Sequence, residues 1–182
     1  MTEPSNKAEQ ILRVAERMAR KGGYNGFSYR DIAKEVGIKA ASVHYHFPSK
    51  EALGAALGRR YTERLLAALG DPEDPEVGSS ALLQRYIGAF RRALVDEGQM
   101  CLCGLLGAEV AELPRPVAAE ARQFFEKNIA WLSIVFARAP GERSPEQVRA
   151  AALQVIATLE GAMILARTLD DPQVFDAVTQ GL

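Results

Sequence analysis

The chain has 182 residues, of which 48% are hydrophobic and 25% charged, and its formal net charge is −1. These values are ordinary for a soluble globular protein and allow one large or two small domains. No apolar run reaches the roughly 20 residues that cross a bilayer, and residues 1–7 lack the apolar core of a signal peptide, so we expect a cytoplasmic protein. Two cysteines, Cys101 and Cys103, are too few for a disulfide framework.

The charge is distributed unevenly along the chain. Residues 1–60 carry eleven basic and six acidic side chains, whereas the rest of the chain carries eleven and seventeen. A basic first third followed by an acidic remainder favours a small DNA-binding module attached to a domain with another role.

The first predicted helix spans about 7–21, where apolar residues recur at helical spacing. Two short helices joined by a tight turn follow over about 28–46, with Ser28 as N-cap and Asp31 placed as in a short capping box. Gly37 tolerates the left-handed conformation that ends a helix, and Pro48 stops the second helix. This pattern predicts a helix-turn-helix that reads the major groove.

A long helix is predicted over about 49–69, capped by Ser49, and we expect it to connect the DNA-binding module to the second domain. Residues 70–75 form a break rich in proline and aspartate. Further helices are predicted over 80–97, 100–113, 114–139, 145–169 and 172–180.

No strand pattern is found, so we predict an all-α fold of about nine helices. It comprises a three-helix DNA-binding head and a helical ligand-binding and dimerisation domain. The expected domains are 1–48 and 49–182.

Residues 8–57 resemble the N-terminal DNA-binding domain of the TetR family of transcriptional regulators. The match runs without a gap through Phe27-Ser28, Asp31-Ile32-Ala33, Val36-Gly37-Ile38, Ser42-Val43, Tyr45-His46-Phe47 and Ser49-Lys50-Glu51-Ala52-Leu53. The chain departs from the family at His44, where tyrosine is usual, so the charge of this position depends on pH.

The resemblance implies a set of residues that contact double-stranded operator DNA. They are Tyr29, Arg30, Lys39, Ala40, Ala41, Ser42, His44, Tyr45, His46 and Lys50. Arg30 and Lys39 have the reach for guanine edges or phosphates, and Lys50 lies at a helix N-terminus that attracts a phosphate. The alternative is that Lys39 and Lys50 are only solvated. No further metal ligands lie near the histidines.

By the same resemblance, the second domain holds a cavity for a small-molecule effector. The candidate lining residues are Tyr86, Phe90, Cys101, Cys103, Phe124, Asn128, Trp131 and Met163, with Phe125, Leu132 and Glu160 as further members. On the alternative interpretation most of them are core residues. Asn128 is the best single candidate, because it is polar within an otherwise apolar stretch.

The segment Cys101-Leu-x-Gly-x-Leu-x-x-Glu has two interpretations. A buried cysteine is usually an inert small hydrophobe. However, the segment also resembles TetR regulators that respond to reactive electrophiles, which would require a thiol of depressed pKa, for example near a helix N-terminus.

Small residues recur through the predicted helix 145–169: Ala150, Ala151, Ala152, Ala157, Gly161, Ala162 and Ala166. They suit close packing of helices within one chain. The resemblance instead implies that the last two helices form a four-helix bundle with a second subunit. A twofold axis is also what a symmetric operator requires.

These features predict a homodimeric regulator, most simply a repressor that a small molecule or thiol-reactive compound releases from its operator. We expect no catalytic residues, metal or cofactor. Two other classes fit part of the pattern: a thiol-dependent reductase using Cys101 and Cys103, and a non-specific architectural DNA-binding protein. The first lacks a partner histidine outside the head, and the second leaves the acidic domain unexplained. The pattern does not decide between repressor and activator.

Overall fold

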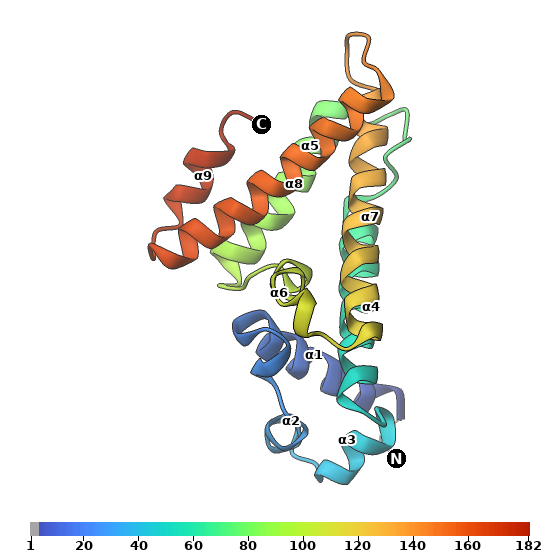
Figure 1. Cartoon of the computed structure of the whole chain (residues 1–182), viewed down its shortest axis with the longest axis vertical. Coiled ribbons are helices and arrows are strands. Elements are labelled where there is room, and N and C mark those ends of the chain that lie inside the picture. The colour runs from blue at the N-terminus through green and yellow to red at the C-terminus, as the bar shows by residue number, and fades with distance from the viewer. Residues whose placement is uncertain (1–3) are drawn as a thin grey trace. The chain divides into compact units, whose positions relative to one another are not determined.

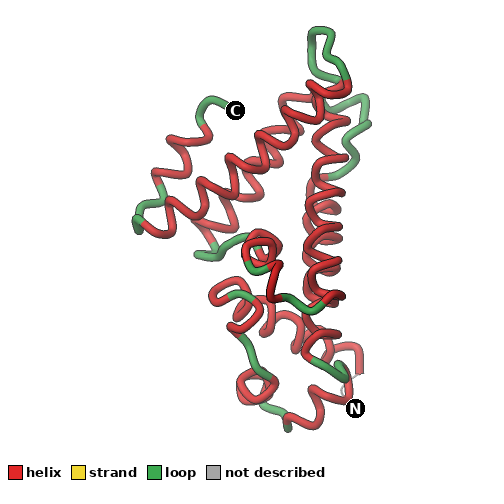
Figure 2. Tube along the Cα trace, viewed as in Figure 1, coloured by secondary structure: helices red, strands yellow, loops and turns green. Residues whose placement is uncertain are grey.

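In a computed structural model the chain is described from residue 4 to residue 182, with side chains from Lys7 onward. All regular structure in this range is helical, with loops between the helices (Figures 1 and 2). The predicted all-α fold is therefore confirmed. The α-helices of the described range are α1 (Pro4–Gly22), α2 (Tyr29–Val36), α3 (Ala40–His46), α4 (Lys50–Leu69), α5 (Ser79–Arg91), α6 (Leu102–Ala108), α7 (Arg115–Ala137), α8 (Pro145–Thr168) and α9 (Gln173–Thr179).

The chain packs into two compact units. Unit 1 contains the residues up to Thr62 together with Leu102–Phe124, and unit 2 contains Glu63–Cys101 together with Phe125–Leu182. Helices α4 and α7 each have residues in both units, because the boundaries between the units fall within these two helices. The sequence-based division after residue 48 follows the end of the helix-turn-helix, whereas unit 1 continues into α4.

Local capping signals produce the helix-turn-helix of unit 1. The Ser28 hydroxyl oxygen accepts a hydrogen bond from the Asp31 backbone N–H at 3.2 Å and begins α2. The Asp31 carboxylate accepts from the Ser28 hydroxyl rather than from its backbone N–H, so the cap is not a full capping box. Gly37, at φ 72°, ends α2 in the left-handed region, as predicted.

The core of unit 1 fixes the position of α3. Ile11 of α1, Ile32 of α2, Val43 of α3 and Leu53 of α4 are fully buried, and Phe27 is almost so. Each buried aliphatic or aromatic side chain of this size stabilises the fold by about 1.5–3 kcal/mol. The inner face of α3 is thereby anchored, and its other faces are left for contacts outside the chain.

Helices α4 and α7 approach closely within unit 1 because two positions of α4 lack a side chain. A Cβ added at Gly58 would lie 2.9 Å from Glu120 Cβ, and one at Gly54 would lie 3.0 Å from Val117 Cγ2. Beside Gly58, the Arg59 guanidinium donates twice to Glu120 Oε1, at 2.7 and 3.1 Å. Residues of the second half of the chain therefore belong to the packed head.

Unit 2 is built around α5, α8 and α9 with the second part of α7. The predicted helix 80–97 is wrong in one respect: its last turn is a π-helical segment, η2 (Arg92–Asp96), in which the Glu97 N–H reaches the Arg92 carbonyl at 3.1 Å. Gly98, at φ 62°, then turns the chain. This wider turn ends α5 one to two turns earlier than the sequence pattern suggested.

Helix α8 begins with a local cap formed by its own sequence. Ser144 and Gln147 form a reciprocal capping box, and Pro145 occupies the first turn. The helix is long and apolar enough to cross a membrane by length and composition alone. It is nevertheless a core helix of unit 2, because Leu159, Ala162, Met163 and five further residues of it are buried.

Candidate nucleic-acid interface and effector site

Helix α3 presents an exposed face next to its buried anchor Val43. Lys39, the N-cap of this helix, is exposed, as is His44. Tyr45 is 84% exposed, the highest value of any large apolar or aromatic side chain in the described chain. An aromatic ring held in solvent on a short, well-anchored helix suits recognition rather than folding.

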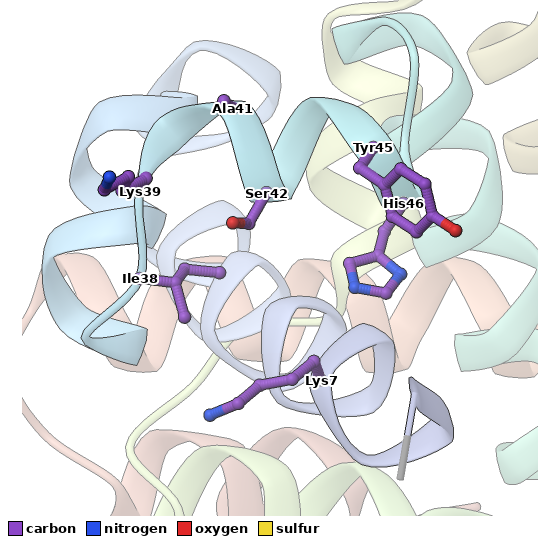
Figure 3. A pocket seen from close by; sticks show the side chains of 7 residues that line it. All are labelled: Lys7, Ile38, Lys39, Ala41, Ser42, Tyr45 and His46. Carbon is purple, nitrogen blue, oxygen red and sulfur yellow. The ribbon is translucent and has the colours of Figure 1, made fainter. Parts of the chain in front are cut away.

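A hollow of about 380 Å³ lies between α3 and the start of α1 (Figure 3). Its lining residues are Lys7, Ile38, Lys39, Ala41, Ser42, Tyr45 and His46. Five of the predicted DNA-contacting residues thus gather at one place. Lys7 joins them and was missed by sequence reasoning, although it belongs to the basic first third of the chain; its ammonium donates to the Gln10 side chain at 3.0 Å.

Two other predicted DNA contacts have structural partners within the head. The Tyr29 hydroxyl donates to the Phe47 carbonyl at 2.7 Å, and its ring lies 4.4 Å from the His44 ring. Burial raises the pKa of Tyr29 to about 12, so this hydroxyl stays protonated at neutral pH. Tyr29 therefore ties α2 to the end of α3 and orients His44. Arg30, the next residue, is exposed on α2.

Lys50 lies in the first turn of α4, where a phosphate contact was predicted. Its ammonium lies 4.6 Å above the Tyr24 ring and 4.9 Å above the Phe27 ring. Partial burial lowers its pKa, and the nearby Glu109 carboxylate acts in the opposite direction. Lys50 therefore has cation–π partners within the head, and its contact with DNA stays a prediction.

Glu109 also holds the turn that precedes the helix-turn-helix. Its carboxylate accepts from the Tyr24 backbone N–H at 2.9 Å. Gly23, at φ 66°, leaves the room for this contact, since an added Cβ would lie 1.8 Å from a Glu109 oxygen. Glu109 follows α6, so this segment of the chain fixes the loop that enters the helix-turn-helix.

A second set of predicted residues meets inside unit 2. The Tyr86 hydroxyl of α5 donates to Asn128 Oδ1 of α7 at 2.9 Å. The Tyr86 ring stacks against Trp131 with centroids 5.7 Å apart and lies 5.3 Å from Phe90. The Trp131 indole N–H donates to the Gly70 carbonyl at 2.9 Å. Asn128, singled out from the sequence, is thus a fully buried hydrogen-bonded group.

Glu160 of α8 joins this group. Burial raises the pKa of Glu160 to about 7, and a hydrogen bond with Cys101 acts in the opposite direction. Burial also raises the pKa of Tyr86, with the charges of Cys101 and Glu160 adding to the effect. Tyr86, Cys101, Asn128 and Glu160 are called the polar cluster below.

The remaining predicted ligand residues are divided between the two units. Met163 is buried in unit 2, whereas Cys103 and Phe124 are buried in unit 1, where Phe124 lies 5.7 Å from the Tyr61 ring. Neither Cys101 nor Cys103 forms a disulfide. Cys101 is 1% exposed and bonded to a carboxyl group, whereas reactive cysteines occupy accessible, electropositive surroundings. These surroundings favour the inert interpretation of Cys101.

Glu160 makes the stability of the fold depend on pH. The folded chain holds a proton on this carboxyl up to about pH 7, whereas the unfolded chain releases it near the ordinary value of 4.5. Its contribution to the free energy of unfolding therefore falls as pH rises from about 4.5 to 7, by up to about 3 kcal/mol. Glu160→Gln is expected to remove this fall, so the variant gains stability over the wild type as pH rises.

Urea unfolding at pH 5, 6, 7 and 8 measures the difference between the two proteins. The matched control is Glu142→Gln, which removes a fully solvated carboxylate from the loop before α8. It is expected to parallel the wild type. Parallel curves for Glu160→Gln would contradict the raised pKa.

No three histidine, cysteine or carboxylate side chains in the described part of the chain are placed to hold a metal ion. The described chain has an exposed surface with lysine and aromatic side chains in unit 1 and a buried polar cluster in unit 2.

Known proteins match the chain in both its N-terminal and its C-terminal regions. Residues 11–57 match the family of bacterial regulatory proteins called the tetR family, and residues 80–181 match the C-terminal domain of LmrA/YxaF-like transcriptional regulators. The HTH-type transcriptional regulator LmrA of Bacillus subtilis (strain 168) is 26% identical over 166 residues, which cover 88% of this chain and 86% of LmrA.

Solved structures agree over nearly the whole chain. A TetR-family regulator from Agrobacterium tumefaciens is 35% identical with a TM-score of 0.89, covering 98% of this chain and 96% of its own. A TetR regulator from Legionella pneumophila is 34% identical with a TM-score of 0.87, covering 98% and 94%. The helix-turn-helix, the two matched domains and these relatives together place the chain among regulators rather than enzymes: it belongs to the TetR family of bacterial transcriptional regulators.

Proposed function

We propose that this protein is a homodimeric repressor that binds a symmetric operator and leaves it when a small molecule binds in unit 2. Members of the family bind operator DNA and small-molecule effectors and act as dimers. The observation that carries the proposal is the exposed face of α3, with Lys7, Lys39, Ser42 and Tyr45 around one hollow. Cations and hydroxyls in this arrangement suit phosphates and base edges of a duplex.

A single α3 has seven residues and reads only a few base pairs. Specific binding therefore calls for a second copy, whose α3 enters the next major groove about 34 Å away. Helices α8 and α9 offer the surface for this copy. The exposed large apolar side chains of these helices and of the α8 C-cap are Leu153, Ile164, Leu165, Leu169 and Val178, which we call the α8–α9 apolar face.

The α8–α9 apolar face has no role in the core, because its side chains are 40–62% exposed while the opposite side of α8 is buried. Figure 1 shows α9 beside the end of α8, and the Arg91–Asp176 ion pair links α9 to α5. Leaving such apolar area in water is unfavourable, at roughly 25 cal/mol per Å². Burial against the same face of a second copy removes this cost.

Leu165→Glu is expected to separate the dimer, because each copy would place a glutamate in the apolar interface. Sedimentation at micromolar concentration should give a monomer, and operator affinity should fall at least about 100-fold with the loss of the paired half-sites. The control is Val110→Glu, an equally exposed apolar side chain of η3 (Val110–Glu112) in unit 1. It should stay dimeric. If the Leu165→Glu protein stayed dimeric, this result would contradict a dimer interface that includes Leu165 of α8.

Release by an effector is a shift between two conformational populations, so the effector must bind the DNA-incompetent population more tightly. Helices α4 and α7 suit the transmission of this shift, because each has residues in both units. We assign the protein to the cytoplasm, where its operator is accessible.

Transcription in vitro from the promoter beside the gene of this protein tests the proposal. A repressor lowers the transcript level when purified protein is added, in proportion to the occupied operator. An increase in transcript would make the protein an activator, and an unchanged level would remove this promoter from its targets.

A further inference from the structure

Unit 2 contains a carboxyl oxygen whose bonding is incomplete. Glu160 as a residue is partly exposed, but its Oε1 atom has no accessible surface and no hydrogen-bond partner within the described chain. Folded proteins leave few buried polar atoms in this state, and each one calls for an explanation. A binding site whose ligand supplies the missing donor is such an explanation.

The donors around Glu160 are already engaged elsewhere. The Tyr86 hydroxyl donates its hydrogen bond to Asn128 at 2.9 Å, and the Trp131 indole N–H donates to the Gly70 carbonyl at 2.9 Å. Cys101 is the side chain that bonds to the Glu160 carboxyl, and no cation of the described chain contributes to its ionisation. The negative charge that Glu160 can carry is therefore not balanced within unit 2.

Buried aromatic side chains lie on the Tyr86 side of this carboxyl. Tyr86 is close enough to Glu160 for the two charges to interact, and its ring continues into Phe90 at 5.3 Å and Trp131 at 5.7 Å. Aromatic faces attract cations, and a carboxylate attached to the same surface strengthens the attraction in a region without bulk water. An anion would be repelled, and a neutral molecule would leave the charge unbalanced.

We propose that Glu160 binds the protonated amine or amidine group of an organic cation, whose apolar body contacts the rings of Tyr86, Phe90 and Trp131. The nitrogen of this cation donates an N–H to Glu160 Oε1. The inference rests on the proposed function, because it specifies the chemical class of the effector. It assigns the main role in the site to Glu160 and leaves Cys101 as its hydrogen-bond partner.

Binding of a cation has a proton signature. A carboxyl that is partly protonated at neutral pH passes its proton to the buffer when the ligand's positive charge arrives. With a pKa of about 7, about half a proton per bound ligand should be released at pH 7. Calorimetry in two buffers of different ionisation enthalpy measures this number directly.

The test uses the full chain and three matched pairs of probes: benzylamine and benzyl alcohol, benzamidine and benzamide, and 1-naphthylmethylamine and 1-naphthalenemethanol. We expect the cation of at least one pair to bind at least about 10-fold more tightly than its neutral partner, with release of protons at pH 7. Glu160→Gln should abolish both the preference and the proton release. Glu142→Gln, the solvated control, should keep both.

A second variant guards against loss of folding. Glu160→Asp keeps the charge on a shorter side chain, so it should retain the preference for the cation with weaker affinity. The proposal is overturned if no cation binds better than its neutral partner to the wild type. It is also overturned if a folded Glu160→Gln protein keeps the preference.

Operator binding is measured separately by fluorescence anisotropy with the same probes. Cation binding through Glu160 without any change in operator affinity would support this site and contradict the proposed release mechanism. Absence of operator binding by the wild type would contradict the proposed function and leave the assignment of Glu160 to be judged by calorimetry alone.

Discussion

Lys39→Ala is expected to lower the affinity of the dimer for its operator by at least about 30-fold. Lys39 is an exposed N-cap residue of α3 and lines the hollow that Lys7 and Tyr45 share. A charge-assisted contact with DNA is worth about 1–3 kcal/mol, and a twofold dimer loses it twice. The folded state should be unaffected, because the side chain is exposed.

Salt dependence identifies the kind of contact that is lost. If Lys39 binds a phosphate, the slope of log affinity against log salt should fall by about two for the dimer. Lys127→Ala removes an equally exposed positive charge from α7 in unit 2 and is the matched control. Equal effects of the two substitutions would mean that only net charge matters and that α3 does not read this operator.

Arg60→Ala is expected to destabilise the head by about 3–5 kcal/mol. Arg60 of α4 donates to Glu16 and Glu9 of α1, with 2.6 Å to the Glu16 carboxylate. The Glu16 side chain is only 7% exposed, so the substitution leaves a buried charge whose other basic neighbour, Arg20, is 3.8 Å away. Removing one partner of a buried ion pair is costly for this reason.

Urea unfolding of Arg60→Ala measures the loss, and Arg91→Ala is the control. Arg91 makes a comparable bidentate contact with Asp176, but both side chains are about half exposed. Its loss should be much smaller, since solvent already screens the pair. A double variant that adds Glu16→Gln to Arg60→Ala should recover part of the stability. Equal losses for Arg60→Ala and Arg91→Ala would contradict the role of burial.

The helix-turn-helix was predictable because its signals are local. Ser28, Gly37 and Pro48 act through the backbone of their immediate neighbours, so their positions in the sequence determine where α2 and α3 begin and end. The capping box of α8 at Ser144 was predictable for the same reason. The face of α3 followed from the resemblance to a family, and the exposure of Tyr45 agrees with that assignment.

Features that depend on distant contacts were not predictable. The π-helical end of α5 has no sequence pattern of its own, because it shifts the hydrogen bond by one residue without changing composition. Lys7 lies 32 residues before Lys39, and only the packing of α1 against α3 brings both to one hollow. Membership of α6 in the packed head likewise depends on Glu109 reaching Tyr24.

The predicted effector-binding residues also depend on distant contacts that the sequence pattern does not reveal. A glutamate within a helix usually faces solvent, so no sequence pattern singled out Glu160 from the aromatic residues around it. Its importance follows from the burial of one oxygen and from its contact with Cys101. Conversely, Phe124 and Cys103 matched the expected composition of a pocket, yet they pack within unit 1.

The central claim is that the exposed face of α3 reads one particular DNA sequence. Fluorescence anisotropy with the duplex upstream of the gene of this protein, and with a shuffled duplex of the same composition, tests it at physiological salt. We expect the natural duplex to bind as a complex with one dimer and at least about 1,000-fold more tightly than the shuffled one. Equal affinity for both duplexes would contradict the claim.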